Sequence, residues 1–297
     1  MLEFKKITLG EIERIKAYFP YSRNRVCDNT VGGNFMWRDF FSTEFTEFND
    51  TVIFKARIQY NGNITAFMPP LGRDYQGSLK QIAEYCRYHD LEIVFFSATD
   101  EDVSLLQKEY PKIDVCRDDN WCDYLYNAED LLLLAGRKYS GQRNHINSFR
   151  KSYPGYVFEE INTGNIADVI EFNHRFSSAL NKDSVIFHEE NSKTIEVLEN
   201  YDLYGMLGGL LRVNGAVIAY SLGEVYNDVL FVHVEKADMS IRGAYQVINN
   251  EFAKHFCCDG VKFINREEDV GDEGLRTSKR SYHPCRIIDK YTVVCYL

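Results

Sequence analysis

The sequence lacks the long apolar segments that membrane helices and export signals need. No window approaches the roughly 18 uninterrupted apolar residues of a membrane span. The first ten residues, MLEFKKITLG, contain no apolar core of a signal peptide, and Glu3 stands where basic residues would belong. We therefore expect no membrane span and a cytoplasmic location.

The sequence also lacks the cysteine patterns of metal sites and disulfide frameworks. Eight cysteines are present, but none lies in a C-x-x-C pair or in a paired Cys/His spacing. In a reducing compartment such cysteines behave as small buried hydrophobic residues. The sequence therefore predicts no metal site.

Several catalytic and binding motifs are missing as well. There is no Walker loop, no G-x-G-x-x-G and no serine nucleophile elbow, so nucleotide-binding and serine-hydrolase functions are disfavoured. The formal net charge of −10 argues against a protein that coats nucleic acid through its overall charge. We expect no DNA partner, although a local basic patch could still bind phosphate.

What the sequence does contain is enough apolar material for a large core. The 297 residues are 45% hydrophobic and 14% aromatic, which fits one large domain or two of about 150 residues each. The first half reads as strand, helix, hairpin, helix, strand, helix and strand, with Asn61-Gly62 at the hairpin turn. We predict two related α/β units, an N-terminal one at 1–135 and a C-terminal one at 136–297.

The second half has the more distinctive order of elements. Three strands at 203–213, 216–226 and 229–235 follow two helices, and Asn214-Gly215 joins the first strand to the second. A long helix from 243, a strand at 261–265, a short helix and a final strand at 287–296 complete the order β-α-α-β-β-β-α-β-α-β. This is the order of the GNAT acyltransferase fold, so we predict a tandem GNAT-like α/β (α+β) fold with two mixed β-sheets flanked by helices.

A basic stretch marks the start of the second half. Residues 137–151, RKYSGQRNHINSFRK, hold five Lys or Arg residues and no acid. Tyr139, Ile146 and Phe149 fall at helical spacing and predict one buried stripe. Three positions along the edge of that stripe are candidate cleft residues: Arg143, Asn147 and Arg150. The alternative is a linker helix with a solvated basic face.

The loop before the long helix is a candidate site for an acyl donor. A helix N-terminus offers free backbone N–H groups and the positive end of the helix dipole. Gly243 would allow a phosphate to approach, and Arg242 would neutralise its charge. The candidate donor-binding residues are Arg242, Gly243, Ala244 and Tyr245, and the alternative is a helix that is merely capped there.

The polar loop after the strand at 261–265 is the candidate catalytic segment. Ligands usually bind at the carboxyl ends of strands in α/β sheets. Glu267 or Asp269 could accept a proton from an amine nucleophile, with a solvated charged loop as the alternative. His233 lies on the last meander strand, where a satisfied core histidine competes with a base. Further cleft candidates follow in and after the loop: Asn265, Arg266, Arg276 and Lys279.

Three blocks of sequence resemble a known bacterial family. They are KYSGQRNHINSFRK, HVEKADMSIRGAYQVINNEF and INREEDVGDEGLRTSKRSYHP, in order over residues 138–284. They are similar to the phosphatidylglycerol lysyltransferase C-terminal-like domain, whose relatives include Fem-type aminoacyltransferases. The resemblance implies a tandem GNAT-like fold and transfer of an aminoacyl group from aminoacyl-tRNA.

Together these patterns predict an acyl or aminoacyl transferase with its site in the second half. An acyl-CoA or an aminoacyl-tRNA, held by its acceptor end, would be a co-substrate, and no tightly bound cofactor is expected. Tyr282 is the candidate proton donor to the leaving group. The alternatives are a non-catalytic ligand-binding protein that keeps the fold, and an ordinary acetyl-CoA N-acetyltransferase.

Overall fold

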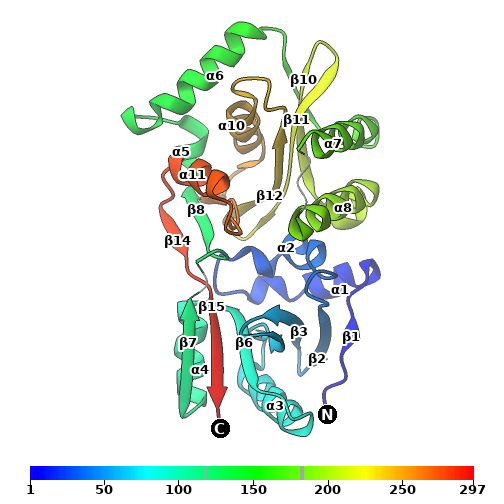
Figure 1. The fold of residues 1–297 in the computed structure, drawn as a ribbon, viewed down its shortest axis with the longest axis vertical. Helices are drawn as coiled ribbons and strands as arrows, with labels where there is room; N and C mark the ends of the chain where they lie inside the picture. Colours follow the sequence, from blue (N-terminus) through cyan, green and yellow to red (C-terminus); the bar gives the residue numbers. More distant parts are fainter. Residues whose placement is uncertain (118, 181–183) are drawn as a thin grey trace. The chain divides into compact units, whose positions relative to one another are not determined.

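The computed structural model describes residues 1–117, 119–180 and 184–297 (Figure 1). These residues form two compact units. The first unit comprises Met1–Asp123, Glu268–Glu273 and Ile287–Leu297, and the second comprises Tyr124–Glu267 and Gly274–Arg286. The chain therefore begins and ends in the first unit.

The first unit is built on an eight-stranded mixed sheet. Its main order is β1-β2-β3-β4-β6-β15-β7, with β5 paired to β3. Most neighbours are antiparallel, but β4 and β6 are parallel. The strands are β1 (Lys5–Lys6), β2 (Glu44–Phe48), β3 (Thr51–Gln59), β4 (Asn63–Phe67), β5 (Leu71–Gly72), β6 (Ile93–Ala98), β7 (Lys112–Arg117) and β15 (Tyr291–Tyr296).

Helices α3 and α4 supply apolar side chains to the core of the first unit. Leu79 and Ile82 of α3 and Leu106 of α4 are buried in one cluster with Phe95 of β6 and Val293 of β15. Asp74 caps α3 by accepting a hydrogen bond from Gly77 N. The helices of this unit are α1 (Ile12–Lys16), α2 (Val31–Met36), α3 (Tyr75–Tyr88) and α4 (Asp100–Glu109).

The second unit is built on a seven-stranded mixed sheet of order β14-β8-β13-β12-β11-β10-β9. The meander β10-β11-β12 is antiparallel, and β13 runs parallel to β12. The strands are β8 (Asp123–Asn127), β9 (Val157–Glu160), β10 (Leu207–Val213), β11 (Ala216–Tyr226), β12 (Val229–Ala237), β13 (Phe263–Asn265) and β14 (Arg286–Ile288).

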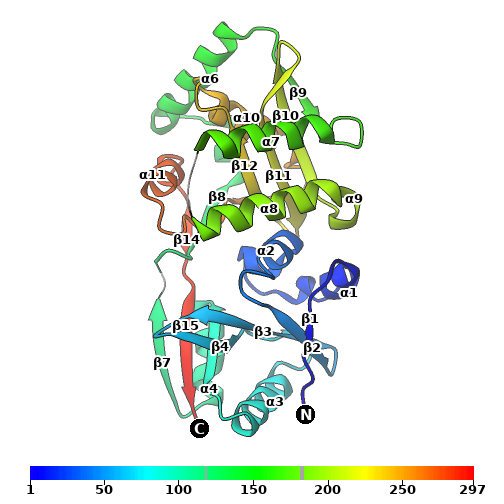
Figure 2. The same cartoon turned by 45° about the vertical axis from the view of Figure 1, so that its right-hand side comes forward.

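Helices cover both faces of the second sheet. Figures 1 and 2 show α7 and α8 along one face and α10 against the other. Phe172 of α7 packs edge-on against Tyr220 of β11, and Phe252 of α10 lies close to Gly223 of the same strand. The helices are α5 (Ala128–Leu133), α6 (Ser140–Ser152), α7 (Ile166–Leu180), α8 (Val185–Glu199), α9 (Tyr201–Tyr204), α10 (Ala244–Phe256) and α11 (Glu273–Ser281).

The two mixed sheets flanked by helices confirm the predicted fold class. Both expected tight turns are present. Asn61 and Gly62 have positive φ in the β3–β4 hairpin, as do Asn214 and Gly215 between β10 and β11. The type of turn that these pairs form is fixed locally, which is why the sequence revealed it.

The compact units divide the chain differently from a single cut after residue 135. The expected strand 287–296 is two strands, and the second of them, β15, pairs with β6 and β7 in the sheet of the first unit. Residues 124–135 belong to the second unit, where β8 pairs with β13. Long-range strand pairing decides both placements, and no local signal reports it. The first meander strand is also shorter than expected, because residues 201–204 form α9.

Candidate functional site

The centre of the candidate site is a buried histidine between two carboxylates in the second unit. His233 Nδ1 lies 2.6 Å from Glu267 Oε1, and His233 Nε2 lies 2.8 Å from Glu224 Oε1. Burial lowers the pKa of His233, but the two carboxylates outweigh it and raise the pKa to about 10. The ring is therefore an imidazolium that donates a hydrogen bond to each carboxylate.

The strand register explains why these three side chains meet. β12 and β13 are parallel with Phe231 opposite Asn265, so His233 and Glu267 each lie two residues further along. On the other side of β12, Phe231 pairs with Glu224 of β11, next to an irregularity in the ladder. The sheet thus places one carboxylate on each side of the ring.

Glu267 is the most exposed member of this group. Its side chain is 13% exposed, against 7% for Glu224 and 2% for His233. Its φ is +58°, a left-handed conformation that residues other than glycine seldom adopt, and its backbone N donates to Asn265 Oδ1 at 2.7 Å. Such strained residues cluster at functional sites. The geometry presents Glu267 as a fixed carboxylate at the end of β13.

A second ionic group lies on the neighbouring positions of the same strands. Arg266 Nη2 donates to Glu235 Oε1 at 2.9 Å, and Asn249 Nδ2 donates to Glu235 Oε2, also at 2.9 Å. Lys279 Nζ donates to the Arg266 carbonyl at 2.5 Å. The arginine is buried, so its charge depends on Glu235 for compensation.

Tyr282 completes this group. The Arg266 guanidinium lies 4.9 Å from the centre of the Tyr282 ring, a cation–π contact. Burial raises the pKa of Tyr282, although Arg266 opposes the shift, so the phenol stays protonated at neutral pH. No described residue hydrogen-bonds its hydroxyl. Tyr282 is therefore a protonated hydroxyl that is available as a donor.

The structure thus brings together a large part of the residues predicted from the second half. Asn265 is the last residue of β13, Arg266 and Glu267 follow it, and α11 supplies Lys279 and, just after its end, Tyr282. Arg276 also lies on α11 and is half-buried. Glu224, Glu235 and Asn249 belong to the group but were not among the predicted site residues. The sheet places Glu224 and Glu235 next to these residues, and α10 contributes Asn249, so a pattern along one strand could not reveal the whole group.

The predicted donor-binding segment forms the start of α10. Gly243 is the N-cap with φ of +89°, and no side chain caps this helix. A Cβ on Gly243 would lie 2.5 Å from the His145 carbonyl oxygen and 3.0 Å from Phe149 Cβ of α6. Glycine is thus required here by close packing against α6. Arg242 is exposed, whereas Ala244 is buried and Tyr245 is half-buried.

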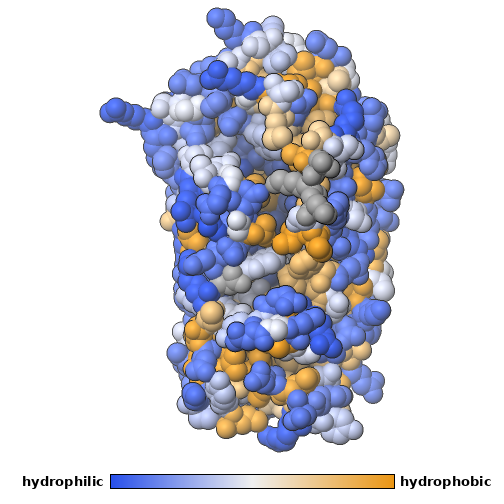
Figure 3. All heavy atoms as spheres, in the orientation of Figure 1, coloured by the Kyte–Doolittle hydropathy of each residue, from blue (hydrophilic) through white to orange (hydrophobic). Residues whose placement is uncertain are grey.

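The basic helix α6 uses its two central arginines for contacts within the second unit. Arg143 donates to the carbonyls of Leu134 and Gly136. Arg150 bonds Glu251 at 2.8 Å. Asn147 is exposed, and Figure 3 shows hydrophilic side chains over the region of α6. Arg143 and Arg150, which were predicted to line a cleft, therefore hold α6 against neighbouring parts of the second unit. The buried apolar stripe of α6 orients the helix so that both arginines lie next to these partners.

Asp269 belongs to the first unit, unlike Glu267. It is buried, and its Oδ1 accepts a 2.9 Å hydrogen bond from Gly271 N. This contact shapes the turn at 269–272, where Asp272 N also bonds the Asp269 carbonyl at 2.8 Å. The polar loop that the sequence presents as one segment is thus shared between two units.

The first unit holds an ionic cluster that sequence reasoning missed. Lys290 Nζ lies 2.5 Å from Asp28 Oδ2 and 2.7 Å from Asp123 Oδ1, and it also bonds Glu268. The Cys27 thiol is 3.5 Å from the same nitrogen. These residues come from four distant parts of the chain, so no spacing within the sequence could reveal the cluster.

Charge compensation explains the protonation of this cluster. Burial disfavours the Lys290 ammonium, but the surrounding carboxylates outweigh it and raise its pKa well above the usual value. Burial raises the pKa of Asp123 to about 7, although Lys290 opposes this. The pKa of Glu268 is lowered, because its contacts with Lys290 outweigh the effect of its burial. Four ligand-type atoms of the cluster lie within 4.8 Å of one another, but the Lys290 ammonium occupies the position of a bound cation.

With this geometry established, comparison with known proteins identifies the family. Residues 19–294 match the family described as phosphatidylglycerol lysyltransferase, C-terminal. The chain belongs to this family. Among the described residues, no helix is both long and apolar enough to cross a membrane.

Solved structures of relatives share the fold over almost the whole chain. A conserved protein of unknown function from Bacteroides thetaiotaomicron is 33% identical, with a TM-score of 0.92 and full coverage of both chains. The C-terminal domain of a lysylphosphatidylglycerol synthetase from Agrobacterium fabrum is 15% identical, with a TM-score of 0.66, covering 97% of this chain and 92% of that one. FemX is 9% identical, with a TM-score of 0.60, covering 98% and 96%.

Another relative matches only in part. An uncharacterised protein from Mycoplasmoides gallisepticum is 26% identical over 178 residues. The match covers 58% of this chain and 55% of that protein, so the chain spans about half the length of this relative. The family match and the fold shared with these solved structures thus agree over most of the chain.

Proposed function

We propose that this protein transfers an acyl or aminoacyl group from a carrier to an amine or hydroxyl acceptor, with its site in the second unit. The observation that carries the proposal is the fixed carboxylate of Glu267 at the carboxyl end of β13, held by the His233 imidazolium at 2.6 Å. Family membership supports the reaction class. The FemX-like fold fits an aminoacyl-tRNA donor, bound by its acceptor end, and an acyl-CoA is the other candidate.

Glu267 is the proposed general base. The imidazolium beside it favours the ionised carboxylate, which is the form that can accept a proton. Glu224, on the other side of the ring, accepts the hydrogen bond of the second ring N–H and so stabilises the charged form of His233. His233 is therefore a positioning residue that fixes the carboxylate, and it does not itself accept the proton.

The reaction needs few steps from the protein. The acceptor nitrogen or oxygen loses its proton to Glu267 and bonds to the carbonyl carbon of the donor. The bond from that carbon to the sulfur or oxygen of the carrier then breaks. Tyr282 supplies a proton to the leaving sulfur or oxygen, because its phenol is protonated and its hydroxyl has no partner among the described residues.

The start of α10 is the proposed place for the carrier phosphates. Among the described residues no side chain caps this helix of 13 residues. Ala244 N and Val247 N bond the carbonyls of Ile241 and Gly243, so the backbone N–H groups of Tyr245 and Gln246 are the ones left for a ligand. Arg242 beside it is exposed and can neutralise a phosphate. The close contact of Gly243 with α6 would hold this N-terminus in a fixed position.

A transfer assay tests the proposal. Candidate donors are first selected by thermal shift with acetyl-CoA, CoA and a non-hydrolysable aminoacyl-tRNA analogue, since a bound ligand raises the melting temperature. With a donor that binds, we expect Glu267→Gln to lower kcat about 100-fold or more without raising the KM for the donor. Glu199→Gln, an exposed residue at the end of α8, is the control for loss of one charge.

Two outcomes would contradict the proposal. One is full transfer activity in Glu267→Gln. The other is an absence of stabilisation by every carrier, which would favour a ligand-binding protein that kept the fold without the chemistry. One observation favours this second function: packing against α6 alone accounts for Gly243, with no need for a nearby phosphate.

A further inference from the structure

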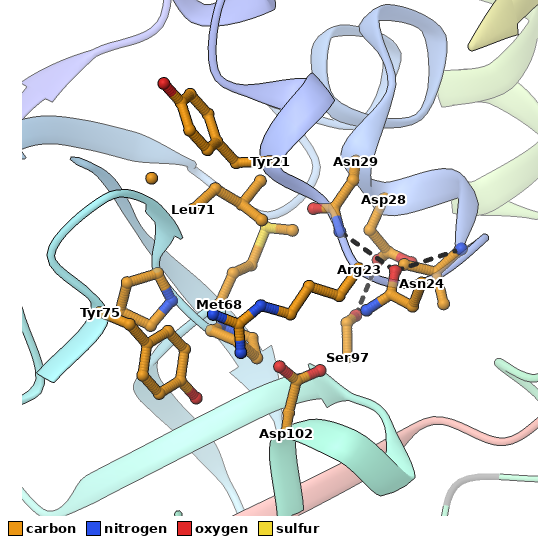
Figure 4. Close-up of a pocket in the computed structure, with 14 residues that line it drawn as sticks. Tyr21, Arg23, Asn24, Asp28, Asn29, Met68, Leu71, Tyr75, Ser97 and Asp102 are labelled. Atoms are coloured by element: carbon orange, nitrogen blue, oxygen red, sulfur yellow. Dashed lines mark hydrogen bonds between the residues drawn. The ribbon is translucent and has the colours of Figure 1, made fainter. Parts of the chain in front are cut away.

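The first unit contains a pocket at the carboxyl ends of two parallel strands. β4 and β6 pair in parallel at Phe67 and Phe95. Met68, which follows β4, and Ser97, near the end of β6, line the pocket. Figure 4 shows Met68 and Leu71 on one side of it and Ser97 on another. Ligands of α/β sheets commonly bind at such carboxyl ends. The pocket contains none of the site residues predicted from the sequence.

The walls of the pocket differ in polarity. One wall is apolar and consists of Met68, Pro69, Pro70 and Leu71. The opposite wall is polar and includes Asn24, Asn29 and Asp28. Both carboxylate oxygens of Asp28 already have a partner, because Lys290 lies 2.5 Å from Oδ2 and Ser97 Oγ donates to Oδ1 at 2.7 Å. It contributes negative charge to the pocket without needing a ligand.

Asp102 provides an acceptor with spare capacity. Its Oδ2 accepts hydrogen bonds from Thr99 N at 2.9 Å and Thr99 Oγ1 at 2.7 Å, which cap α4. No described residue donates to its Oδ1. Burial raises the pKa of Asp102, so a cation placed beside it would stabilise its charged form.

Tyr75 forms an aromatic side of the same pocket. Its hydroxyl is buried and has no hydrogen-bond partner among the described residues. The Arg23 guanidinium lies 5.9 Å from the centre of its ring. In Figure 4 this guanidinium lies between Tyr75 and Asp102. The chain thus already places a cation of its own in the pocket.

The balance of charge is negative. Two carboxylates, Asp28 and Asp102, line the pocket against one guanidinium. Behind Asp28, the ionic cluster adds Glu268 and, in part, Asp123, whose pKa is about 7, against the single ammonium of Lys290. We propose that this pocket binds the ammonium or guanidinium group of a small organic cation, which hydrogen-bonds Asp102 Oδ1 and lies against the Tyr75 ring. This inference stands on the first unit alone and does not depend on the proposed transfer reaction.

Such a ligand would displace the Arg23 side chain, which occupies the pocket in this structure. Its side chain is 56% exposed, and its ion pair with Glu101 has a separation of 3.7 Å. Exposed pairs of this kind contribute little to stability, so the arginine can swing into solvent at small cost. The ligand then takes its place beside Tyr75 and Asp102.

Calorimetric titration with three matched probes tests the proposal. The probes are n-butylammonium, n-butanol and n-butyrate, which share an apolar chain and differ in charge. We expect only n-butylammonium to bind, and to bind about tenfold more tightly to Arg23→Gln than to the unmodified protein. That gain corresponds to an arginine that fills the pocket about nine-tenths of the time.

A second variant tests whether the cation binds to Asp102. Asp102→Asn keeps a side-chain oxygen for Thr99, so the cap of α4 is retained, but it removes the negative charge. Combined with Arg23→Gln, it should weaken n-butylammonium binding at least about tenfold. Glu109→Gln, at the other end of α4, is the matched control and should change nothing.

Three results would overturn the proposal. They are stronger binding of n-butyrate than of n-butylammonium to Arg23→Gln, no binding of any probe to that variant, and unchanged binding after loss of the Asp102 charge. If Asp102→Asn unfolds, the comparison of probes on Arg23→Gln alone still decides, because that variant keeps Asp102 and its cap of α4.

Discussion

Lys290 and Asp123 form an ion pair in the interior of the first unit, with 2.7 Å between Nζ and Oδ1. Neither side chain reaches solvent to any useful extent, at 2% and 0% exposure. Asp28 and Glu268 bond the same ammonium. One lysine near the end of the chain therefore compensates three acids from different segments of the first unit.

Replacing Lys290 by methionine should destabilise the first unit strongly. The change keeps much of the side-chain volume but leaves buried carboxylates without a partner, which typically costs about 3–5 kcal/mol. Chemical denaturation of both proteins at neutral pH measures the difference in the free energy of unfolding. Lys108→Met, at an exposed position of α4, is the control. A loss below about 1 kcal/mol for Lys290→Met would show that the cluster does not depend on this ammonium.

The imidazolium of His233 should make stability depend on pH in the alkaline range. Histidine has a pKa of about 6.5 in an unfolded chain, whereas the pKa of His233 in the fold is raised to about 10. The folded state then holds more protons between these values, so stability is fully present below pH 6.5 and falls as the pH rises towards 10.

The variant His233→Gln isolates this contribution. The difference in unfolding free energy between the unmodified protein and the variant should be largest near pH 6 and should shrink steadily up to pH 10. Denaturation curves at several pH values measure it. An equal difference at both ends of the range would mean that His233 is not charged in the folded protein.

Two glycines of the second unit should respond to alanine in opposite ways. Gly243 has φ of +89°, and a Cβ there would lie 2.5 Å from the His145 carbonyl oxygen, so Gly243→Ala should cost about 1–3 kcal/mol. Gly141 lies in α6 with nothing within 4 Å of a Cβ, so Gly141→Ala should stabilise by about 0.5–1 kcal/mol. Thermal melts of both variants check the pair, and similar effects of the same sign would refute the packing account.

We expect Arg242 to contribute to binding of the donor and not to the stability of the fold. Its side chain is exposed beside the start of α10, so Arg242→Gln should leave the melting temperature within about 1–2 °C of the original. If α10 receives a carrier phosphate, the same change should weaken donor binding about tenfold and reduce its dependence on salt. Titration of the selected donor at low and high salt measures both effects. Unchanged affinity would remove Arg242 from the proposed carrier site.

Local patterns in the sequence were enough to determine much of the second unit. Asn214-Gly215 defines the hairpin between β10 and β11, because few residues adopt the positive φ of that turn. The apolar spacing of Tyr139, Ile146 and Phe149 predicted the buried stripe of α6, and all three are buried. The segment after β13 was predicted to be polar and catalytic from its position at the end of a strand; its polar character is confirmed, and its catalytic role stays a prediction.

Tertiary structure alone decided which side chains meet. Glu224 reaches His233 only through the pairing of β11 with β12, and Lys290 reaches Asp28 only because the last strand joins the sheet of the first unit. Strand pairing between distant segments depends on the core as a whole, so it cannot be predicted from the residues next to each strand in the sequence. For the same reason the sequence could not show that Glu267 and Asp269, two positions apart, belong to different units.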